Sequence, residues 1–336
     1  MNTWGRFFRV SLLGESHGEG VGALLDGVPA GLPLKVGDFA VDLGRRRGGA
    51  PGTTRRREKD VPCLRTGVRA GRTTGAPLLI WIENRDVRSA EYERFRRTPR
   101  PGHADFTAGW KFGRFNDIRG GGHFSGRLTA PLVAAGVVAK KLIAPAEAAA
   151  RVTEAGGETS PRSIRAAIAA AVSEGESIGG IVECRVRGLP PGLGEPFFDS
   201  AESLLAHAAF SIPGIKGIEF GAGFGAARMR GGEFNDPIVD RRGRTATGHS
   251  GGINGGLTNG GGLVFRAAVR PAASISRPQR TVDLKTGRPV LLRVGGRHDA
   301  CIALRVPPVL EAAAAIVMAD LMLMEGRIPR IARATR

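Results

Sequence analysis

Residues 297 to 305, RHDACIALR, bring four kinds of reactive side chain together within five positions. Arg297 supplies a guanidinium, His298 an imidazole, Asp299 a carboxylate and Cys301 a thiol. A metal site would need a second pair of ligands at regular spacing, and the neighbouring sequence offers none. Two apolar residues follow Cys301, which predicts a thiol that packs as a small buried hydrophobe. Arg297 and Asp299 stand on the same side of an extended chain, where they could present a cation to an anion and a carboxylate to a proton.

Two further histidines lie in turns. In LLGESHGEGVG (12–22), glycines on both sides of Ser16 and His17 let the backbone approach a ligand, although a solvent-exposed turn is the simpler alternative. The order GESHG is not the GxSxG of a hydrolase. In FRRTPRPGHAD (95–105), His103 follows an arginine-rich run that favours its neutral form until an anion arrives. That behaviour suits a general acid for a leaving phosphate, while a basic loop with an incidental histidine is the alternative.

Three segments are rich in glycine. RGGGHFSGRLTA (119–130) leads into a helix whose N-terminus could receive a phosphate beside Ser125 and Arg127, or it is only a tight junction. GHSGGINGGLTNGGG (248–262) could pack against a flat or phosphorylated ligand, or form a mobile loop. GAGFGA (221–226) fits a dinucleotide-binding pattern, but no helical segment follows it, so the Rossmann interpretation is rejected.

The elements that must position these residues alternate without a regular βαβ rhythm. Apolar runs predict strands over 7–13, 77–83, 180–188 and 262–269. Helices are predicted over 38–47, over 127–143, from Ser160 and Pro161 as cap and first position, and over 307–326. The helix over 127–143 is apolar nearly all round and should be buried. We therefore expect an α+β fold in a single domain over residues 1–336.

Composition limits the class of protein. The 336 residues are 42% apolar, enough for a large core, and no run of about 20 apolar residues predicts a membrane span. The N-terminus lacks a signal peptide's order, so we expect a cytoplasmic protein with reduced cysteines. The net charge is +18 and only seven of the 49 basic residues are lysines. Arginine-biased codon usage is one explanation of this arginine excess, and guanidiniums that surround small polyanions are another. Scarce aromatic residues, 6%, argue against nucleic-acid binding.

Seven ordered motifs resemble those of one family. GESHG, DLGRRR, RPGHAD, RGGGHFSGR, SGGINGGLTNG, RPAASI and RHDACIALRVPPVLE, from about residue 5 to about residue 325, resemble chorismate synthase. The resemblance implies the 1,4-anti elimination of phosphate from 5-enolpyruvylshikimate 3-phosphate, which gives chorismate and requires reduced FMN without net redox change. It also implies a homotetramer whose subunits hold a helical core between antiparallel sheets.

The resemblance also implies a set of site residues and no metal. His17 would protonate the flavin, His103 would assist departure of phosphate, and Asp299 with Ser16 would relay the proton delivered to the flavin. Arginines would surround the anions, namely Arg45, Arg46, Arg47, Arg127 and Arg297. The FMN site would contain Ser125, Arg127, Pro213, Gly214, Gly255, Arg270, Pro271, Ala272, Ala273, Ser274 and Arg297.

Three departures from the family pattern stand out. His123 and Phe124 precede Ser125 where many members have RSS, so only the serine carries over. Arg270 replaces the usual lysine and keeps its charge. The segment GGAPGTTRRR lacks an arginine used by some members, which weakens the case for NADP, and no long insertion indicates NADPH-dependent self-reduction. A separate flavin reductase is therefore expected. The rival interpretations are a nucleic-acid-binding protein and a flavin oxidoreductase that consumes reduced flavin stoichiometrically.

Overall fold

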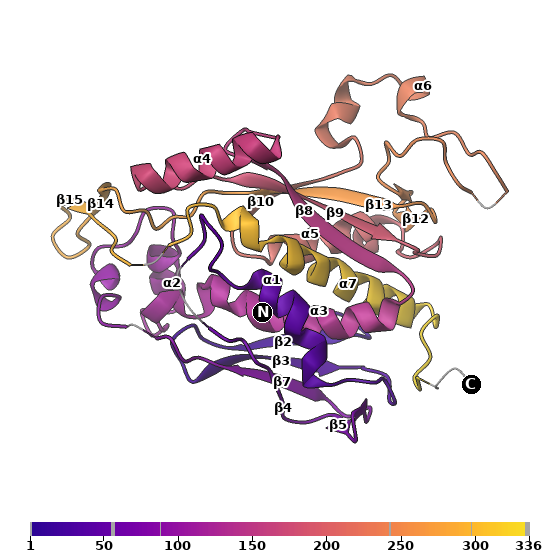
Figure 1. Cartoon of the computed structure of the whole chain (residues 1–336), viewed down its shortest axis with the longest axis horizontal. Helices are drawn as coiled ribbons and strands as arrows, with labels where there is room; N and C mark the ends of the chain where they lie inside the picture. The colour runs from indigo at the N-terminus through magenta and orange to yellow at the C-terminus, as the bar shows by residue number, and fades with distance from the viewer. Residues whose placement is uncertain (1, 55–57, 88, 242, 297, 333–336) are drawn as a thin grey trace.

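Two antiparallel sheets enclose a layer of helices in the computed structural model of the chain (Figure 1). The structure describes residues 2–54, 58–87, 89–241, 243–296 and 298–332. The first sheet has the order β1-β2-β3-β7-β4, with β1 (Thr3–Trp4), β2 (Arg9–Gly14), β3 (Gly20–Asp26), β7 (Leu78–Glu83) and β4 (Cys63–Leu64). The second has the order β10-β13-β9-β8, with β10 (Ile215–Phe220), β13 (Leu263–Val269), β9 (Gly180–Arg187) and β8 (Glu147–Ala155).

Three two-stranded hairpins and the helices complete the described fold. The hairpins pair β5 (Val68–Arg69) with β6 (Arg72–Thr73), β11 (Ile253–Asn254) with β12 (Leu257–Thr258), and β14 (Gln279–Val282) with β15 (Pro289–Leu292). The α-helices are α1 (Ala40–Arg46), α2 (Asp105–Lys111), α3 (Thr129–Ile143), α4 (Pro161–Glu174), α5 (Ala201–Phe210), α6 (Gly231–Phe234) and α7 (Pro307–Met324). The 3-10 helices are η1 (Val36–Phe39), η2 (Glu93–Arg96), η3 (Arg119–Phe124), η4 (Gly126–Leu128), η5 (Phe197–Asp199), η6 (Gly223–Arg228) and η7 (Ile302–Arg305).

Helices α3 and α7 form the middle layer because most of their residues are apolar and buried. α3 packs against β3 and β7 of the first sheet, and α7 packs against β8 and β9 of the second. The length and composition of α7 would suffice to cross a membrane, but 83% of that span is buried inside the protein, as expected for a core helix. One hydrophobic cluster runs from Phe8 to Leu321 and joins both sheets through these helices.

The observed elements confirm the predicted fold class, α+β with helices between antiparallel sheets. The four predicted strands correspond to β2, β7, β9 and β13, and the four predicted helices to α1, α3, α4 and α7. Ser160 caps α4, accepting a hydrogen bond from the Ser163 N–H at 3.1 Å, and Pro161 begins the helix. The GAGFGA segment forms a 3-10 turn instead of a dinucleotide-binding loop and helix.

The contact between α3 and α7 depends on a glycine. A Cβ added to Gly136 would lie 2.2 Å from the Cβ of Ala312. We expect Gly136→Ala to lower the free energy of unfolding by about 1–3 kcal/mol through overpacking, although alanine is the better helix former. Urea denaturation measures this. The control is Gly109→Ala in α2, where the added methyl would meet only Arg114 Cγ at 3.8 Å and should not destabilise. Equal effects of the two substitutions would contradict this explanation.

Candidate active site

A cavity of about 650 Å³ lies where loops from both halves of the chain meet. This volume is ordinary for a small-molecule site, for which about 300–1,000 Å³ is typical. Its walls include residues from the turn after β2, the end of α1, the glycine-rich loop before α3, the segments 212–214 and 272–274 with Arg270, and the segments 294–296 and 298–309 up to the start of α7. Segments far apart in the sequence therefore build one site.

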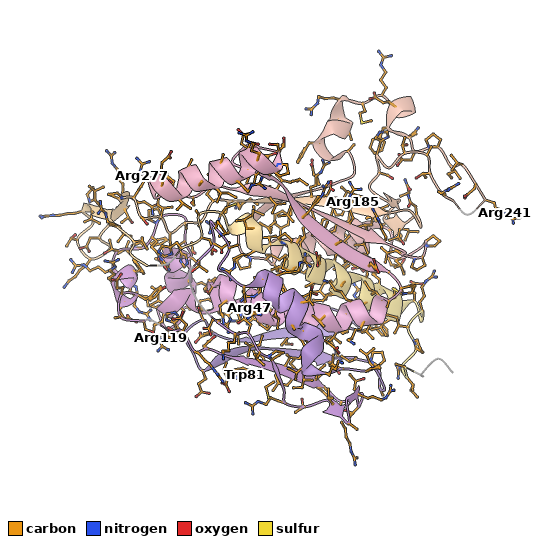
Figure 2. The ribbon with its side chains drawn as sticks, in the orientation of Figure 1. Arg47, Trp81, Arg119, Arg185, Arg241 and Arg277 are labelled. Atoms are coloured by element: carbon orange, nitrogen blue, oxygen red, sulfur yellow. The ribbon has the colours of Figure 1, made fainter. Side chains whose placement is uncertain are left out.

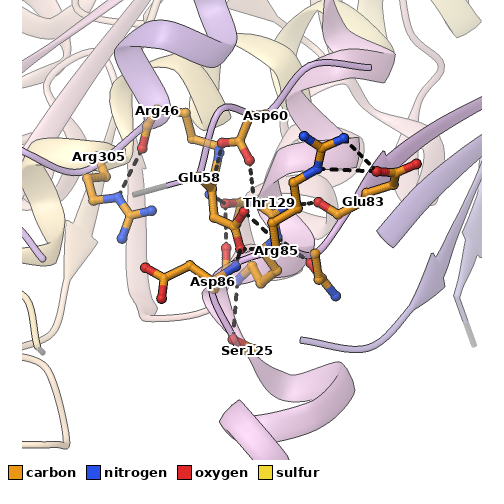
Figure 3. Close-up of polar contacts among 12 residues, drawn as sticks. Arg46, Glu58, Asp60, Glu83, Arg85, Asp86, Ser125, Thr129 and Arg305 are labelled. Atoms are coloured by element: carbon orange, nitrogen blue, oxygen red, sulfur yellow. Dashed lines mark hydrogen bonds and ion pairs between the residues drawn. The ribbon is translucent and has the colours of Figure 1, made fainter. Parts of the chain in front are cut away.

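Two buried guanidiniums share one carboxylate in this wall, and Figure 3 shows one of them, Arg46, beside that carboxylate, Asp60. Arg46 Nη2 donates to Asp60 Oδ2 at 2.6 Å and Arg46 Nη1 donates to Thr129 Oγ1 at 3.2 Å. Arg127 Nη1 forms an ion pair with Asp60 Oδ1, and Arg127 Nε donates to Asn84 Oδ1 at 2.8 Å. The cluster thus carries one more positive charge than negative.

Burial changes the acidity of this cluster. Desolvation lowers the pKa of Arg46 to about 10, so the guanidinium remains protonated at neutral pH. Burial also opposes ionisation of Asp60, but the charges of Arg46 and Arg127 outweigh it and hold the pKa of Asp60 below its ordinary value. Arg46 Nε is buried without a hydrogen-bond partner among the described residues. The geometry therefore suits an anionic ligand.

The three consecutive arginines at the C-terminal end of α1 lie in different surroundings. Arg46 and Arg47 line the cavity, whereas Arg45 does not. Arg45 instead makes two hydrogen bonds of 2.7 Å to the two carboxylate oxygens of Glu311. Successive side chains of a helix point about 100° apart, so three adjacent arginines cannot share one direction. In the described structure Arg45 thus lies away from the cavity, and its expected contact with the substrate stays a prediction.

Ser16 and His17 follow β2 and lie against the glycine-rich loop. His17 lines the cavity, with its Nδ1 2.9 Å from Ser89 Oγ and its ring edge-to-face with Tyr92 at 5.2 Å. Ser16 is fully buried behind the wall, donates its N–H to Gly122 O at 3.1 Å, and has an Oγ without a partner among the described residues. Hydrogen bonds in the part of the chain described do not join Ser16 to Asp299, so the expected relay stays a prediction.

The backbone at Gly120 holds His17 in place. A Cβ on this residue would lie 2.3 Å from His17 Cδ2 and 2.8 Å from Ser16 Oγ. We expect Gly120→Ala to displace the imidazole and reduce turnover at least tenfold in a folded protein. The control is Gly113→Ala, which has nearly the same φ, +57° against +60°, but meets only Phe115 at 3.5 Å. Both variants carry the same backbone strain, so an equal loss of activity would contradict the role given to the His17 contact.

His103 lies on the other side of the same loop, at the start of α2. It lines the cavity, and a Cβ on Gly121 would lie 3.4 Å from His103 Nε2. Its Nδ1 is 2.7 Å from Asp105 Oδ1. The neighbouring residues Gly120 and Gly121 thus face His17 and His103, the two imidazoles that the sequence singled out. Ser125, which follows these glycines and caps η4, also lines the cavity.

Asp299 enters the cavity from the stretch RHDACIALR. Its Oδ1 accepts from the Thr54 N–H at 2.8 Å, and its Oδ2 lies 3.0 Å from Arg305 Nη1. Arg305 Nε also donates to the Arg46 carbonyl at 2.9 Å, which links this carboxylate to the arginine cluster (Figure 3). His298 lines the cavity too, and burial lowers its pKa. Arg297 lies outside the described residues.

Backbone-rich segments form the remaining wall. Pro213, Gly214, Arg270 and the range 272–274 line the cavity, and the Arg270 N–H donates to the Gly214 carbonyl at 2.9 Å. Pro271 lies between Arg270 and this range but does not line the cavity in the described structure. Exposed backbone beside arginines fits a flat phosphorylated cofactor such as FMN.

Gly255 is not brought to this cavity. It forms the turn of the β11–β12 hairpin, whose next residue, Gly256, accepts a hydrogen bond from the Ala201 N–H at 2.8 Å. The hairpin is thereby held against the start of α5, and Gly255 itself faces open space. Gly255 therefore lies apart from this cavity in the described structure, and its expected contact with FMN stays a prediction.

Cys301 is fully buried beside the site, and burial raises the pKa of its thiol. This outcome confirms that it packs as a small hydrophobe. Sequence reasoning did not single out Asp60, Arg100 or Arg305. Arg100 and Arg305 stand within the quoted motifs RPGHAD and RHDACIALR, whereas Asp60 stands in EKDVP, which has no recognisable pattern.

The fold and the cavity define a class of protein. It is an enzyme with a helical layer between two antiparallel sheets, and its imidazoles, carboxylates and guanidiniums gather where acid–base chemistry on an anionic small molecule can occur.

Comparison with known proteins identifies the family. The sequence profile of the family described as chorismate synthase matches residues 8–323. Chorismate synthase of Chitinophaga pinensis is 57% identical over 333 residues, covering 98% of this chain and 99% of that protein. The enzyme of Thermococcus kodakarensis is 45% identical over 343 residues, 95% and 97% of the two chains. A crystal structure of chorismate synthase superposes with a TM-score of 0.75 at 28% identity, covering 96% of this chain and 93% of that one. The chain belongs to the chorismate synthase family and is therefore a carbon–oxygen lyase of the shikimate pathway.

Proposed function

We propose that this chain converts 5-enolpyruvylshikimate 3-phosphate into chorismate by 1,4-anti elimination of phosphate and a ring hydrogen, with reduced FMN bound beside the substrate. Family membership supports the reaction. The observation that carries it for this chain is that His17, His103 and Asp299 line one cavity together with the buried Arg46 and Arg127.

The arginines bind and neutralise the substrate. A molecule with two carboxylates and a phosphate, beside an anionic flavin, can leave water only if its charges are paired. Arg46 and Arg127 are already oriented by Asp60, and Arg305 by Asp299, so little side-chain entropy is lost on binding. Arg47 extends this surface at the end of α1.

The histidines and Asp299 handle protons. His103 donates a proton to the phosphate oxygen as the C–O bond breaks. His17, with Ser16 behind it, holds a proton for the flavin, and Asp299 receives the proton that originates from the ring carbon. The chemistry that reduced FMN supplies is the temporary loan of an electron to the substrate, returned when the ring hydrogen leaves. Pro213, Gly214, Ser125, Arg270 and residues 272–274 would hold this cofactor.

The domain organisation, oligomeric state, cellular location and ligand class are proposed on the same basis. The chain would form a single domain, which the continuous hydrophobic cluster supports, and would work as a cytoplasmic homotetramer supplied with reduced flavin by a separate reductase. Small anions, not nucleic acid, would be its ligands. The labelled arginines support this, since Arg185, Arg241 and Arg277 project from widely separated parts of the molecule instead of forming one stripe (Figure 2).

An anaerobic phosphate-release assay tests the proposal. With dithionite-reduced FMN, the protein should release phosphate from 5-enolpyruvylshikimate 3-phosphate over many turnovers without net oxidation of the flavin, and oxidised FMN should give none. Stoichiometric consumption of reduced flavin would favour the rival oxidoreductase. Retention on a polyanion column that FMN and substrate leave unchanged would favour nucleic-acid binding.

A further inference from the structure

The surroundings of His103 differ from those of His17 in one decisive way. The Nδ1 of His17 faces the neutral hydroxyl of Ser89 at 2.9 Å, whereas the Nδ1 of His103 faces the carboxylate oxygen Oδ1 of Asp105 at 2.7 Å. A carboxylate can only accept hydrogen bonds, so this contact requires a proton on Nδ1. A hydroxyl can donate or accept and imposes no such choice.

Asp105 is itself fixed. Its side chain is 1% exposed at the first turn of α2 and is bound by Arg100 through three hydrogen bonds. Arg100 Nε and its backbone N–H reach Oδ2 at 2.8 and 3.0 Å, and Arg100 Nη2 reaches Oδ1 at 2.8 Å. The guanidinium in turn lies 4.5 Å from the ring centre of Phe95 and 5.7 Å from that of Tyr92.

This anchoring keeps the carboxylate ionised. Burial raises the cost of its charge, but hydrogen bonds and charges from Arg100 and His103 outweigh burial and hold the pKa of Asp105 below its ordinary value. Arg100 Nη2 lies 3.1 Å from His103 Nδ1, but both atoms carry protons and both point to the shared oxygen Oδ1. Asp105 is therefore the acceptor for each of them.

We propose that Asp105 is a positioning residue for the reaction: it fixes the Nδ1–H form of His103, so that Nε2 is the ring nitrogen that gives its proton to the departing phosphate. The inference rests on the proposed function. Before the step the ring is an imidazolium with both nitrogens protonated. As the C–O bond breaks, its electron pair stays on the phosphate oxygen and the Nε2 proton moves there, leaving neutral His103 with Nδ1–H still bonded to Asp105. Solvent protonates Nε2 again before the next turnover.

The substitution Asp105→Asn isolates this role. An asparagine held by Arg100 through its oxygen turns its NH2 group towards His103, which favours an unprotonated Nδ1 and opposes the imidazolium. We expect kcat to fall by about 10²-fold or more, with affinities for FMN and substrate nearly unchanged. Asp105→Glu should recover part of the lost activity because it restores an acceptor-only group. The matched control is Glu202→Gln, which removes an acidic residue from the first turn of α5 instead.

A spectroscopic readout separates positioning from mere folding. In protein labelled with ¹⁵N-histidine, with the His103 signals assigned by their loss in His103→Gln, the neutral ring should be protonated on Nδ1 in the wild type and on Nε2 in Asp105→Asn. A neutral His103 protonated on Nε2 in the wild type would overturn the inference even if the variant failed to fold. So would unchanged kcat in Asp105→Asn. If the wild type released no phosphate, the proposed function would fail instead, and the ring measurement would still stand on its own.

Discussion

His103→Ala should lower the rate of phosphate release by about 10²-fold or more, the usual contribution of a general acid. The imidazole stands in the cavity wall, with Nδ1 engaged by Asp105 and the Nε2 edge beside Gly121. Without it, the leaving phosphate must depart with its full negative charge. Single-turnover phosphate release measures the chemical step, and anaerobic absorbance titration of FMN measures binding, which should change little.

His207→Ala provides the control for this prediction. His207 is exposed on α5 and does not line the cavity, so its removal should leave the rate unchanged. An unaltered rate in His103→Ala would remove the general-acid role. A parallel loss of flavin binding and rate would indicate that His103 supports the site only structurally.

Asp60→Asn should lower the free energy of unfolding by about 3–5 kcal/mol. The side chain is fully buried between Arg46 and Arg127, which are each 3% exposed. An amide of the same shape leaves two buried guanidiniums without a counter-charge, and they repel each other. Urea unfolding at pH 7 measures the loss, and activity should fall with it because the two arginines lose their orientation.

The control is Asp26→Asn, which breaks an Arg9–Asp26 pair on the surface, where the two side chains are 54% and 42% exposed. That pair should contribute less than about 1 kcal/mol. The pH dependence gives a second test. The pKa of Asp60 is lower in the folded chain than its ordinary 3.8, so its stabilisation is complete above that pH and is lost as pH falls through the folded value. The difference between wild type and Asp60→Asn should therefore narrow below about pH 4, and a constant difference would contradict the electrostatic explanation.

The sequence predicted those helices and strands whose own residues carry a clear apolar period or a capping pattern. Four helices and four strands follow from apolar periodicity and from caps such as Ser160. Elements with weaker patterns, such as β8 and α5, were not predicted, because β8 mixes alanines with scattered charged residues and α5 is rich in alanine. Their place is set by packing against β9 and α7, which a single stretch of sequence does not display.

The site residues also divide into those that the sequence indicated and those that only the fold brings together. Residue types and turn chemistry indicated His17, His103 and Asp299, whereas the arginines at the end of α1 were indicated only by the resemblance to the family. The sequence also predicted that the helix over 127–143 is buried, because it is apolar nearly all round.

Only the tertiary structure decided which charges meet. Arg45 pairs with Glu311, 266 positions away, while its neighbour Arg46 pairs with Asp60 inside the cavity. Gly255 lies in a hairpin held against α5, apart from the cavity. Coulomb attraction and desolvation act over a few ångströms of space and are blind to sequence separation, so these partners are fixed only when α3 and α7 bring the two sheets together.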